Sequence, residues 1–231
     1  MASPSSTTLV VVGDEADAAL HTLDGLANVR TARLRSVPDS DAVRWTSGGG
    51  TPYLVHDRDP LEHVAAAWVE FFEALSSNPP DVLFVPIGLG SGFAAAAAAR
   101  AHCGAPTKLI GVVSAHATAY LASFRAGHVI ESPVSTQLAD GMACRTPVAE
   151  ALEVIRHEAE DVVAVSDEEV AGAMRALFAD THNVAEGAGA AALAAAMQQQ
   201  ARWQGKSIGI ALTGGNVDAP VLARVLAGAA R

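Results

Sequence analysis

Three alternating glycines, Gly88, Gly90 and Gly92, follow an apolar run in the stretch VPIGLGSGFAAAAAAR (residues 85–100). A strand, a glycine turn and an alanine-rich helix would let main-chain N–H groups converge at a helix N-terminus, where the helix dipole favours an anion. Ser91 can add a hydroxyl donor to the same turn. The spacing therefore predicts either a phosphate-binding loop or a tight strand-to-helix turn that binds no ligand.

Two other glycine-rich segments favour the ligand-binding interpretation. TGGN (residues 213–216) follows the apolar run at 207–212, and EGAGA (residues 186–190) begins an alanine-rich segment. Ligands of parallel α/β sheets bind beyond the carboxyl ends of the strands, which is where turns such as GLGSG and TGGN would lie. These segments therefore favour a bound ligand over a tight turn that binds none.

Two nucleotide-binding motifs are excluded. Phe93 stands where a dinucleotide fingerprint requires its third glycine, and the expected strand at 108–113 has no acid at its end for ribose hydroxyls. The GKS at 205–207 has Gln200 where a P-loop requires glycine, and it precedes a strand instead of following one. The loop therefore predicts neither an NAD site nor a Walker motif.

Composition limits the classes of partner. The net charge is −10, which argues against binding to nucleic acid or to an anionic membrane. Cys103 and Cys144 have no CxxC spacing and predict neither a zinc site nor a disulfide framework. The uncharged run at 82–99 contains Pro86 and three glycines, so a strand, turn and helix explain it better than a membrane span. No basic region precedes LVVV at 9–12, and a cytoplasmic protein is expected.

Strand and helix patterns alternate along the chain, which predicts an α/β fold with a doubly wound, largely parallel sheet. The expected strands are 8–13, 29–37, 52–55, 82–87, 108–113, 161–165 and 207–212. The expected helices are 14–27, 59–77, 91–103, 117–126, 148–159, 167–183, 186–203 and 219–230. A loop is expected over 38–53, marked by Gly48–Gly50, and Ser166 with Glu169 predicts a capping box.

Five segments, in chain order, resemble the pyridoxal-phosphate (PLP) threonine/serine dehydratases. They are VPIGLGSG, GVVSAHATAY, LADGMACRTP, VSDEEVAGAMRALFADTHNVAEGAGAAALAA and ALTGGNVD. These ammonia-lyases have fold type II, like the β subunit of tryptophan synthase, and include serine racemase. The resemblance runs from about Tyr53 to the end and is weaker over 8–37. It implies a large PLP-binding domain at 53–231 and an incomplete small α/β domain at 1–52.

The resemblance also implies which residues hold the cofactor. The loop around its 5′-phosphate would consist of Gly88, Leu89, Gly90, Ser91 and Gly92. The family commonly has four glycines there, so Leu89 and Ser91 are departures. Thr213 stands where the family has a serine that bonds the pyridine nitrogen, and it keeps the hydroxyl. Glu186 matches an acid that faces the active site, or it is simply an acid at a helix N-terminus.

No metal site is expected. Relatives such as serine racemase bind a divalent cation through two acids, and the corresponding positions here are Val113 and Ala119. His116, which lies between them, is expected to be a turn residue and not a ligand.

The catalytic lysine of the family has no counterpart here. The two lysines of the chain, Lys108 and Lys206, each directly precede an expected strand, at the edge of the sheet away from the glycine turns. Neither lies in the S-F-K-x-R-G-like motif of the Schiff-base lysine, and the family's S-x-G-N-H segment is also absent. No catalytic residue is therefore identified.

Three hypotheses about function remain open. The chain is the carboxyl-terminal portion of a dehydratase whose amino-terminal segment or separate subunit carries the lysine, and it is inactive alone. Otherwise it is a pseudoenzyme that binds PLP or an amino acid, or an α/β protein that binds another phosphate ligand. With the lysine supplied, the resemblance implies β-elimination from threonine or serine to a 2-oxo acid and ammonia, in a homodimer.

Overall fold

The computed structural model describes residues 9–10, 35–39, 42–46, 53–55 and 61–228, and the statements below refer to these residues. Some sequence expectations lie outside them. These are the helix over 14–27, most of the strand over 29–37, the glycines at 48–50, and the start of the next helix at Asp59 and Pro60. The proposed division of the chain at residues 52 and 53 stays a prediction.

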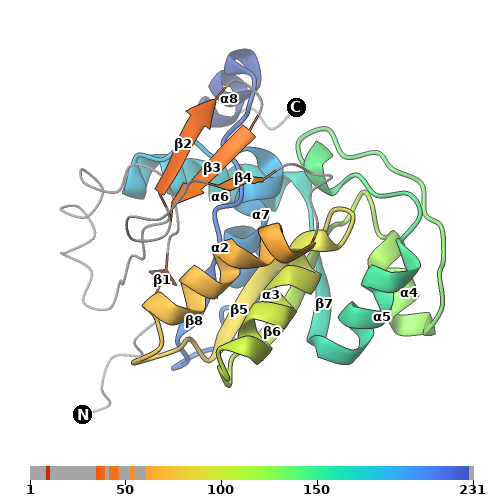
Figure 1. Ribbon diagram of the computed structural model, residues 1–231. Coiled ribbons are helices and arrows are strands. Elements are labelled where there is room, and N and C mark those ends of the chain that lie inside the picture. Colours follow the sequence, from red (N-terminus) through yellow and green to blue (C-terminus); the bar gives the residue numbers. More distant parts are fainter. Residues whose placement is uncertain (1–8, 11–34, 40–41, 47–52, 56–60, 229–231) are drawn as a thin grey trace, which may run out of the picture.

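A parallel sheet of five strands forms the centre of the described fold, in the order β1-β8-β5-β6-β7 (Figure 1). Its strands are β1 (Leu9–Val10), β5 (Val82–Pro86), β6 (Lys108–Ser114), β7 (Ala159–Val165) and β8 (Ile208–Ile210). Each neighbouring pair in this sheet is parallel. The α/β class and the parallel sheet expected from the sequence are thereby confirmed.

A second, antiparallel sheet contains β2 (Arg35–Asp39), β3 (Ala42–Thr46) and β4 (Tyr53–Val55). The short strand expected at 52–55 is confirmed as β4. The loop expected over 38–53 is wrong for residues 38–39, which belong to β2, and for residues 42–46, which pair with both β2 and β4. AVRWT contains β-branched and aromatic residues that favour extended backbone. The glycines at 48–50 led to the prediction of a loop over the whole stretch.

Seven helices and one 3₁₀ turn lie between or after the described strands. They are α2 (Leu61–Ala74), α3 (Ser91–His102), α4 (Ala119–Ala126), η1 (Asp140–Met142), α5 (Ala149–Glu158), α6 (Asp167–Thr181), α7 (Gly187–Gln198) and α8 (Ala219–Leu226). Helices α2 to α5 share one hydrophobic core with one face of the parallel sheet, and α6 to α8 share a second core with the other face. The sheet is therefore doubly wound.

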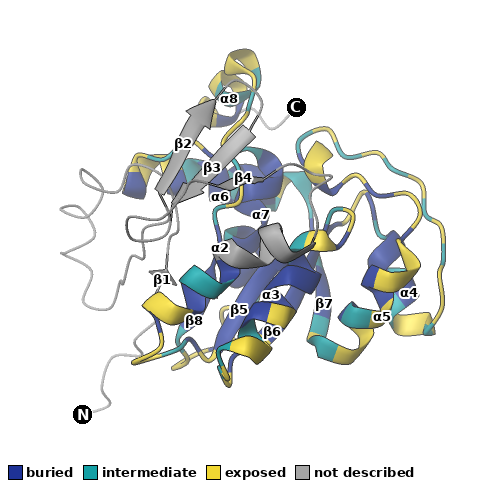
Figure 2. Cartoon of the chain, in the orientation of Figure 1, coloured by how far each residue is buried: buried dark blue, intermediate teal, exposed yellow. Residues whose placement is uncertain are grey.

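Strand β5 supplies side chains to both cores because successive residues of a strand point to opposite faces. Leu83 and Val85 pack in the core of α2 and α3, whereas Val82 and Phe84 pack in the core of α6 and α7. Figure 2 shows the central strands buried. The alanines of α7 are buried on most of its turns, which lets that helix lie close to the sheet and to α6.

The uncharged run at 82–99 is divided between β5, a turn and α3, as the sequence predicts. No helix within the described part of the chain is both long and apolar enough to cross a bilayer.

Candidate cofactor site

The three glycine-rich segments meet at the carboxyl edge of the parallel sheet. Gly88 follows β5, and a methyl group at that position would overlap the carbonyl oxygen of Gly141 in η1. Gly189 in the first turn of α7 lies equally close to the carbonyl of Gly214, which follows β8. These contacts bring GLGSG, the Asp140–Met142 turn, EGAGA and TGGN into one cluster, as the strand order requires.

The GLGSG loop begins helix α3 with a left-handed residue. Gly90 has φ of 96° and caps the helix, and its carbonyl accepts the Ala94 N–H at 3.0 Å. The N–H groups of residues 91–93 lie in the first turn, where the residues four positions earlier are not helical, and no main-chain hydrogen bond between described residues uses them. A side chain at Gly92 would meet no atom within 4 Å. The unpaired N–H groups of residues 91–93 and the open space beside Gly92 fit a phosphate group.

Leu89 and Ser91 are both exposed in this loop. The Leu89 side chain is 60% exposed, so it contributes little packing to the turn. The departures from the family's four glycines therefore leave the inner side of the loop, formed by Gly88 and Gly90, free of side chains.

Tyr120 of α4 is a residue that the sequence analysis did not identify. Its hydroxyl donates to the Leu89 carbonyl at 2.5 Å and accepts from the Val148 N–H at 3.1 Å. The side chain is 1% exposed. Burial raises the pKa of Tyr120 to about 12, although the hydrogen bond from Val148 lowers it, so the phenol stays protonated. The sequence could have indicated it only as the single tyrosine of GVVSAHATAY, one of the segments that resemble the dehydratases.

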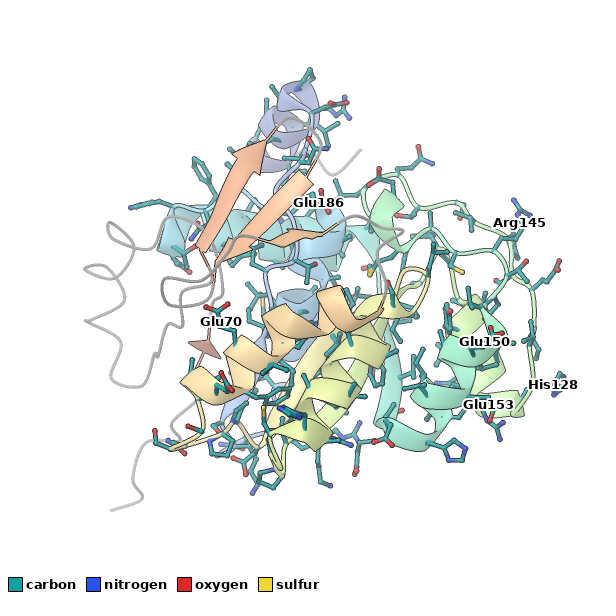
Figure 3. All side chains as sticks on the ribbon, viewed as in Figure 1. Glu70, His128, Arg145, Glu150, Glu153 and Glu186 are labelled. Atoms are coloured by element: carbon teal, nitrogen blue, oxygen red, sulfur yellow. The ribbon has the colours of Figure 1, made fainter. Side chains whose placement is uncertain are left out.

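Glu186 directly precedes α7 (Figure 3). It contacts two of the glycine segments. Its N–H donates to the Gly214 carbonyl at 3.0 Å. A methyl group at Gly141 would lie 3.9 Å from its carboxylate oxygen Oε1, and one at Gly214 would overlap that oxygen. The acid thus lies between η1 and the TGGN turn, and its side chain is half-buried.

Thr213 is exposed in the turn after β8. The rest of this turn is tightly held, because a methyl group at Gly215 would lie 2.7 Å from the Val184 carbonyl oxygen. The structure therefore brings Thr213 to the same sheet edge as Glu186 and the GLGSG loop.

Both lysines lie at the opposite, amino edge of the sheet. Lys108 begins β6 and its Nζ lies 2.8 Å from Glu160 Oε1. Lys206 shortly precedes β8 and its Nζ lies 3.3 Å from Asp81 Oδ1. Neither lysine is brought to the glycine cluster, in agreement with the placement that the sequence predicts.

The two positions that the resemblance matched to a relative's metal ligands are apolar and buried. Val113 lies in β6 and Ala119 begins α4, and His116 lies in the turn between them, 3.5 Å from the Ser135 hydroxyl. Over the described residues, no three His, Cys, Asp or Glu side chains are grouped as metal ligands. The expectation that there is no metal site stays a prediction.

Comparisons with known proteins place this arrangement in a family. The model of the family "Pyridoxal-phosphate dependent enzyme" matches residues 8–214. L-threonine ammonia-lyase of Geobacter sulfurreducens is 36% identical over 150 residues, 64% of this chain and 37% of that protein. L-threonine ammonia-lyase of Thermotoga maritima is 30% identical over 187 residues, 80% of this chain and 46% of that protein. The aligned part thus spans less than half the length of each of these relatives.

A solved structure shares the fold. The processed form of threonine deaminase isoform 2 from Solanum lycopersicum aligns with a TM-score of 0.67 at 20% identity. The alignment covers 96% of this chain and 67% of that chain.

Proposed function

This chain belongs to the family of pyridoxal-phosphate-dependent enzymes, and we propose that it forms the phosphate-binding part of a threonine/serine dehydratase. Pyridoxal phosphate is the cofactor of the family. The observation that supports the proposal is the convergence of GLGSG, EGAGA and TGGN at one edge of the sheet, around Glu186 and Gly214.

The GLGSG loop is proposed to bind the 5′-phosphate. Main-chain N–H groups at residues 91–93 and the positive end of the α3 dipole would stabilise the phosphate charge. The Ser91 hydroxyl would add a donor, while Gly88, Leu89, Gly90 and Gly92 would contribute main chain alone. Glycine at position 90 adopts the left-handed conformation that begins the helix without a steric penalty.

Thr213 and Glu186 are proposed to set the chemistry of the cofactor ring. A threonine hydroxyl beside the pyridine nitrogen leaves that nitrogen unprotonated, whereas a carboxylate there would favour its protonation. Glu186 would orient the TGGN turn through its hydrogen bond to Gly214. Bound pyridoxal phosphate supplies an electron sink for the charge that develops at the α-carbon of an amino acid.

The proposed reaction removes the hydroxyl and amino groups of threonine or serine. Loss of water and hydrolytic release of ammonia convert the hydroxy amino acid into the corresponding 2-oxo acid, so the net products are a 2-oxo acid and ammonia. The names of the two relatives, both L-threonine ammonia-lyases, favour a hydroxy amino acid as substrate.

A lysine from outside this chain is proposed to complete the site. Lys108 and Lys206 are both paired with acids at the far edge of the sheet. The proton at the α-carbon therefore needs a base supplied by another segment or subunit, and the chain alone would bind the cofactor without turnover. We also propose that the complete protein is a cytoplasmic homodimer.

The first test is cofactor binding to the purified chain. Equilibrium dialysis should show saturable binding of pyridoxal phosphate and much weaker binding of pyridoxal, which lacks the phosphate. Assays with L-threonine and L-serine should give no 2-oxo acid beyond that formed by free pyridoxal phosphate. Absence of phosphate-dependent binding, or turnover by the chain alone, would contradict the proposal.

The paired lysines also favour a second candidate, a protein that binds pyridoxal phosphate without catalysis. Isolation from its own cells separates the two. After borohydride reduction, intact-mass analysis of the dehydratase should find the cofactor on a lysine outside this sequence, in a heavier chain or in a bound subunit. A mass of 23.6 kDa with no cofactor fixed to lysine and no lysine-bearing partner would support the second candidate.

A further inference from the structure

The Tyr120 side chain hydrogen-bonds to the main chain of the GLGSG loop. It lies on α4, and its hydroxyl bridges the carbonyl of Leu89 and the N–H of Val148, which caps α5. Since the two partners belong to segments that lie about sixty residues apart in the sequence, a single buried phenol joins the start of α3 to the start of α5.

The loop is otherwise positioned by contact on its inner side. A methyl group on Gly90 would lie 2.8 Å from the Tyr120 hydroxyl and 2.6 Å from Ala151 Cβ, so the loop rests directly on α4 and α5. On its outer side Leu89 is 60% exposed and Gly92 faces open space. The Tyr120 hydroxyl therefore adds a specific hydrogen bond to a loop that is packed on its inner side and open on its outer side.

We propose that Tyr120 is a positioning residue for phosphate binding, holding the Leu89–Gly90 peptide so that the amides after it point to one anion. This inference rests on the proposed function. Fixing the Leu89 carbonyl fixes the plane of the Leu89–Gly90 peptide. The left-handed turn at Gly90 leads from that peptide to the donors at residues 91–93. The phenol does not titrate below about pH 11, since burial holds its pKa at about 12.

The test compares Tyr120→Phe with a matched variant on the same helix. Ser123 is also buried, and its hydroxyl also has two main-chain partners, the carbonyl and N–H of Ile130, but it does not touch the loop. Ser123→Ala therefore removes a similar pair of hydrogen bonds elsewhere. Equilibrium dialysis with pyridoxal phosphate and with pyridoxal is measured for the wild-type chain and both variants.

Tyr120→Phe should weaken pyridoxal phosphate binding about tenfold, the effect of losing one well-placed hydrogen bond, and leave pyridoxal binding unchanged. Ser123→Ala should change neither affinity. An unchanged preference for the phosphate in Tyr120→Phe, or an equal loss of both ligands, would overturn the inference. A wild-type chain without preference for the phosphate refutes the proposed function instead, and the inference with it.

A second variant keeps the phenol and removes one partner. Val148 has φ of −71°, a value that proline adopts, so Val148→Pro deletes the N–H without changing the backbone angle. It should weaken pyridoxal phosphate binding about threefold, because one hydrogen bond to the Tyr120 hydroxyl remains.

Hydrogen exchange measures the stability of the loop in the absence of ligand. The Ala94 amide donates to the Gly90 carbonyl, so its exchange rate reports how often the start of α3 opens. Exchange there should be faster in Tyr120→Phe than in Ser123→Ala, and equal rates would overturn the inference.

Discussion

Glu186 and Gly214 are joined through both their main chains and the Glu186 side chain. The Glu186 N–H donates to the Gly214 carbonyl at 3.0 Å, and the Glu186 carboxylate occupies the space where a side chain of residue 214 would lie. The carbonyl of Gly214 also lies against the Cα of Gly189 in the first turn of α7. The TGGN turn is therefore held by α7 on two sides.

These contacts predict different outcomes for two alanine substitutions. Gly189→Ala should reduce the free energy of unfolding by about 3 kcal/mol, because the new methyl group overlaps a main-chain carbonyl that cannot move away. Gly214→Ala should reduce it by about 1 kcal/mol, since the Glu186 carboxylate can rotate aside. Urea unfolding measures the free energy of unfolding of both variants. Equal losses would contradict the view that residue 189 meets a fixed main-chain carbonyl and residue 214 a movable side chain. Gly214→Ala should still weaken pyridoxal phosphate binding by displacing Glu186.

The left-handed turn at Gly90 predicts a strong effect of Gly90→Ala. Alanine there has both an unfavourable φ of 96° and close contacts with Tyr120 and Ala151, so we expect a loss of about 3 kcal/mol. Gly104→Ala is the control, because its φ is 62° but a side chain meets no atom within 4 Å. It should cost about 1 kcal/mol, the left-handed strain alone. Similar losses in both variants would show that the contacts around Gly90 are unimportant.

The lysine positions predict that neither lysine takes part in cofactor binding. The double variant Lys108→Arg with Lys206→Arg keeps both positive charges beside Glu160 and Asp81. Its affinity for pyridoxal phosphate should equal that of the wild type, and its stability should change by less than about 1 kcal/mol, as expected for surface ion pairs. A large loss of binding in dialysis would place one of these lysines at the cofactor.

Asp81 predicts a pH dependence of stability. The hydrogen bond from the Ser207 main-chain N–H, at 2.8 Å, is the main cause that lowers the pKa of Asp81 below its ordinary value of 3.8, and Lys206 lowers it further. A carboxyl with a lowered pKa in the folded state contributes stability above its unfolded-state pKa, and this is lost as the pH falls through the folded-state value.

Urea unfolding between pH 5 and 2 tests this, with Asp81→Asn as the comparison. The wild type should lose more stability than the variant below about pH 4, where the unfolded carboxyl takes up its proton first. The difference should stay under about 1 kcal/mol, because the Asp81 side chain is 44% exposed. If the stabilities of the wild type and of Asp81→Asn fell in parallel with pH, Asp81 would not contribute to the pH dependence of stability.

Local features of the fold could be predicted from the sequence because they depend on short-range rules. The capping box of Ser166 and Glu169 forms as predicted, with the Glu169 N–H donating to the Ser166 hydroxyl at 3.2 Å. The alternation of helices and strands from residue 61 onward is also confirmed, although the helix predicted over 186–203 ends at Gln198. Hydrophobic periodicity and cap residues carry this information within a few positions.

The sequence by itself determined that GLGSG and TGGN each follow a strand. It also determined that Lys108 and Lys206 each precede a strand. Only the tertiary structure decided which of these segments touch. The strand order puts β8 beside β5, so that TGGN and GLGSG share an edge, and helix packing places Tyr120 against Leu89 and Glu186 against Gly214. Contacts between residues some thirty or more positions apart arise from strand order and helix packing, which no local preference of the chain encodes.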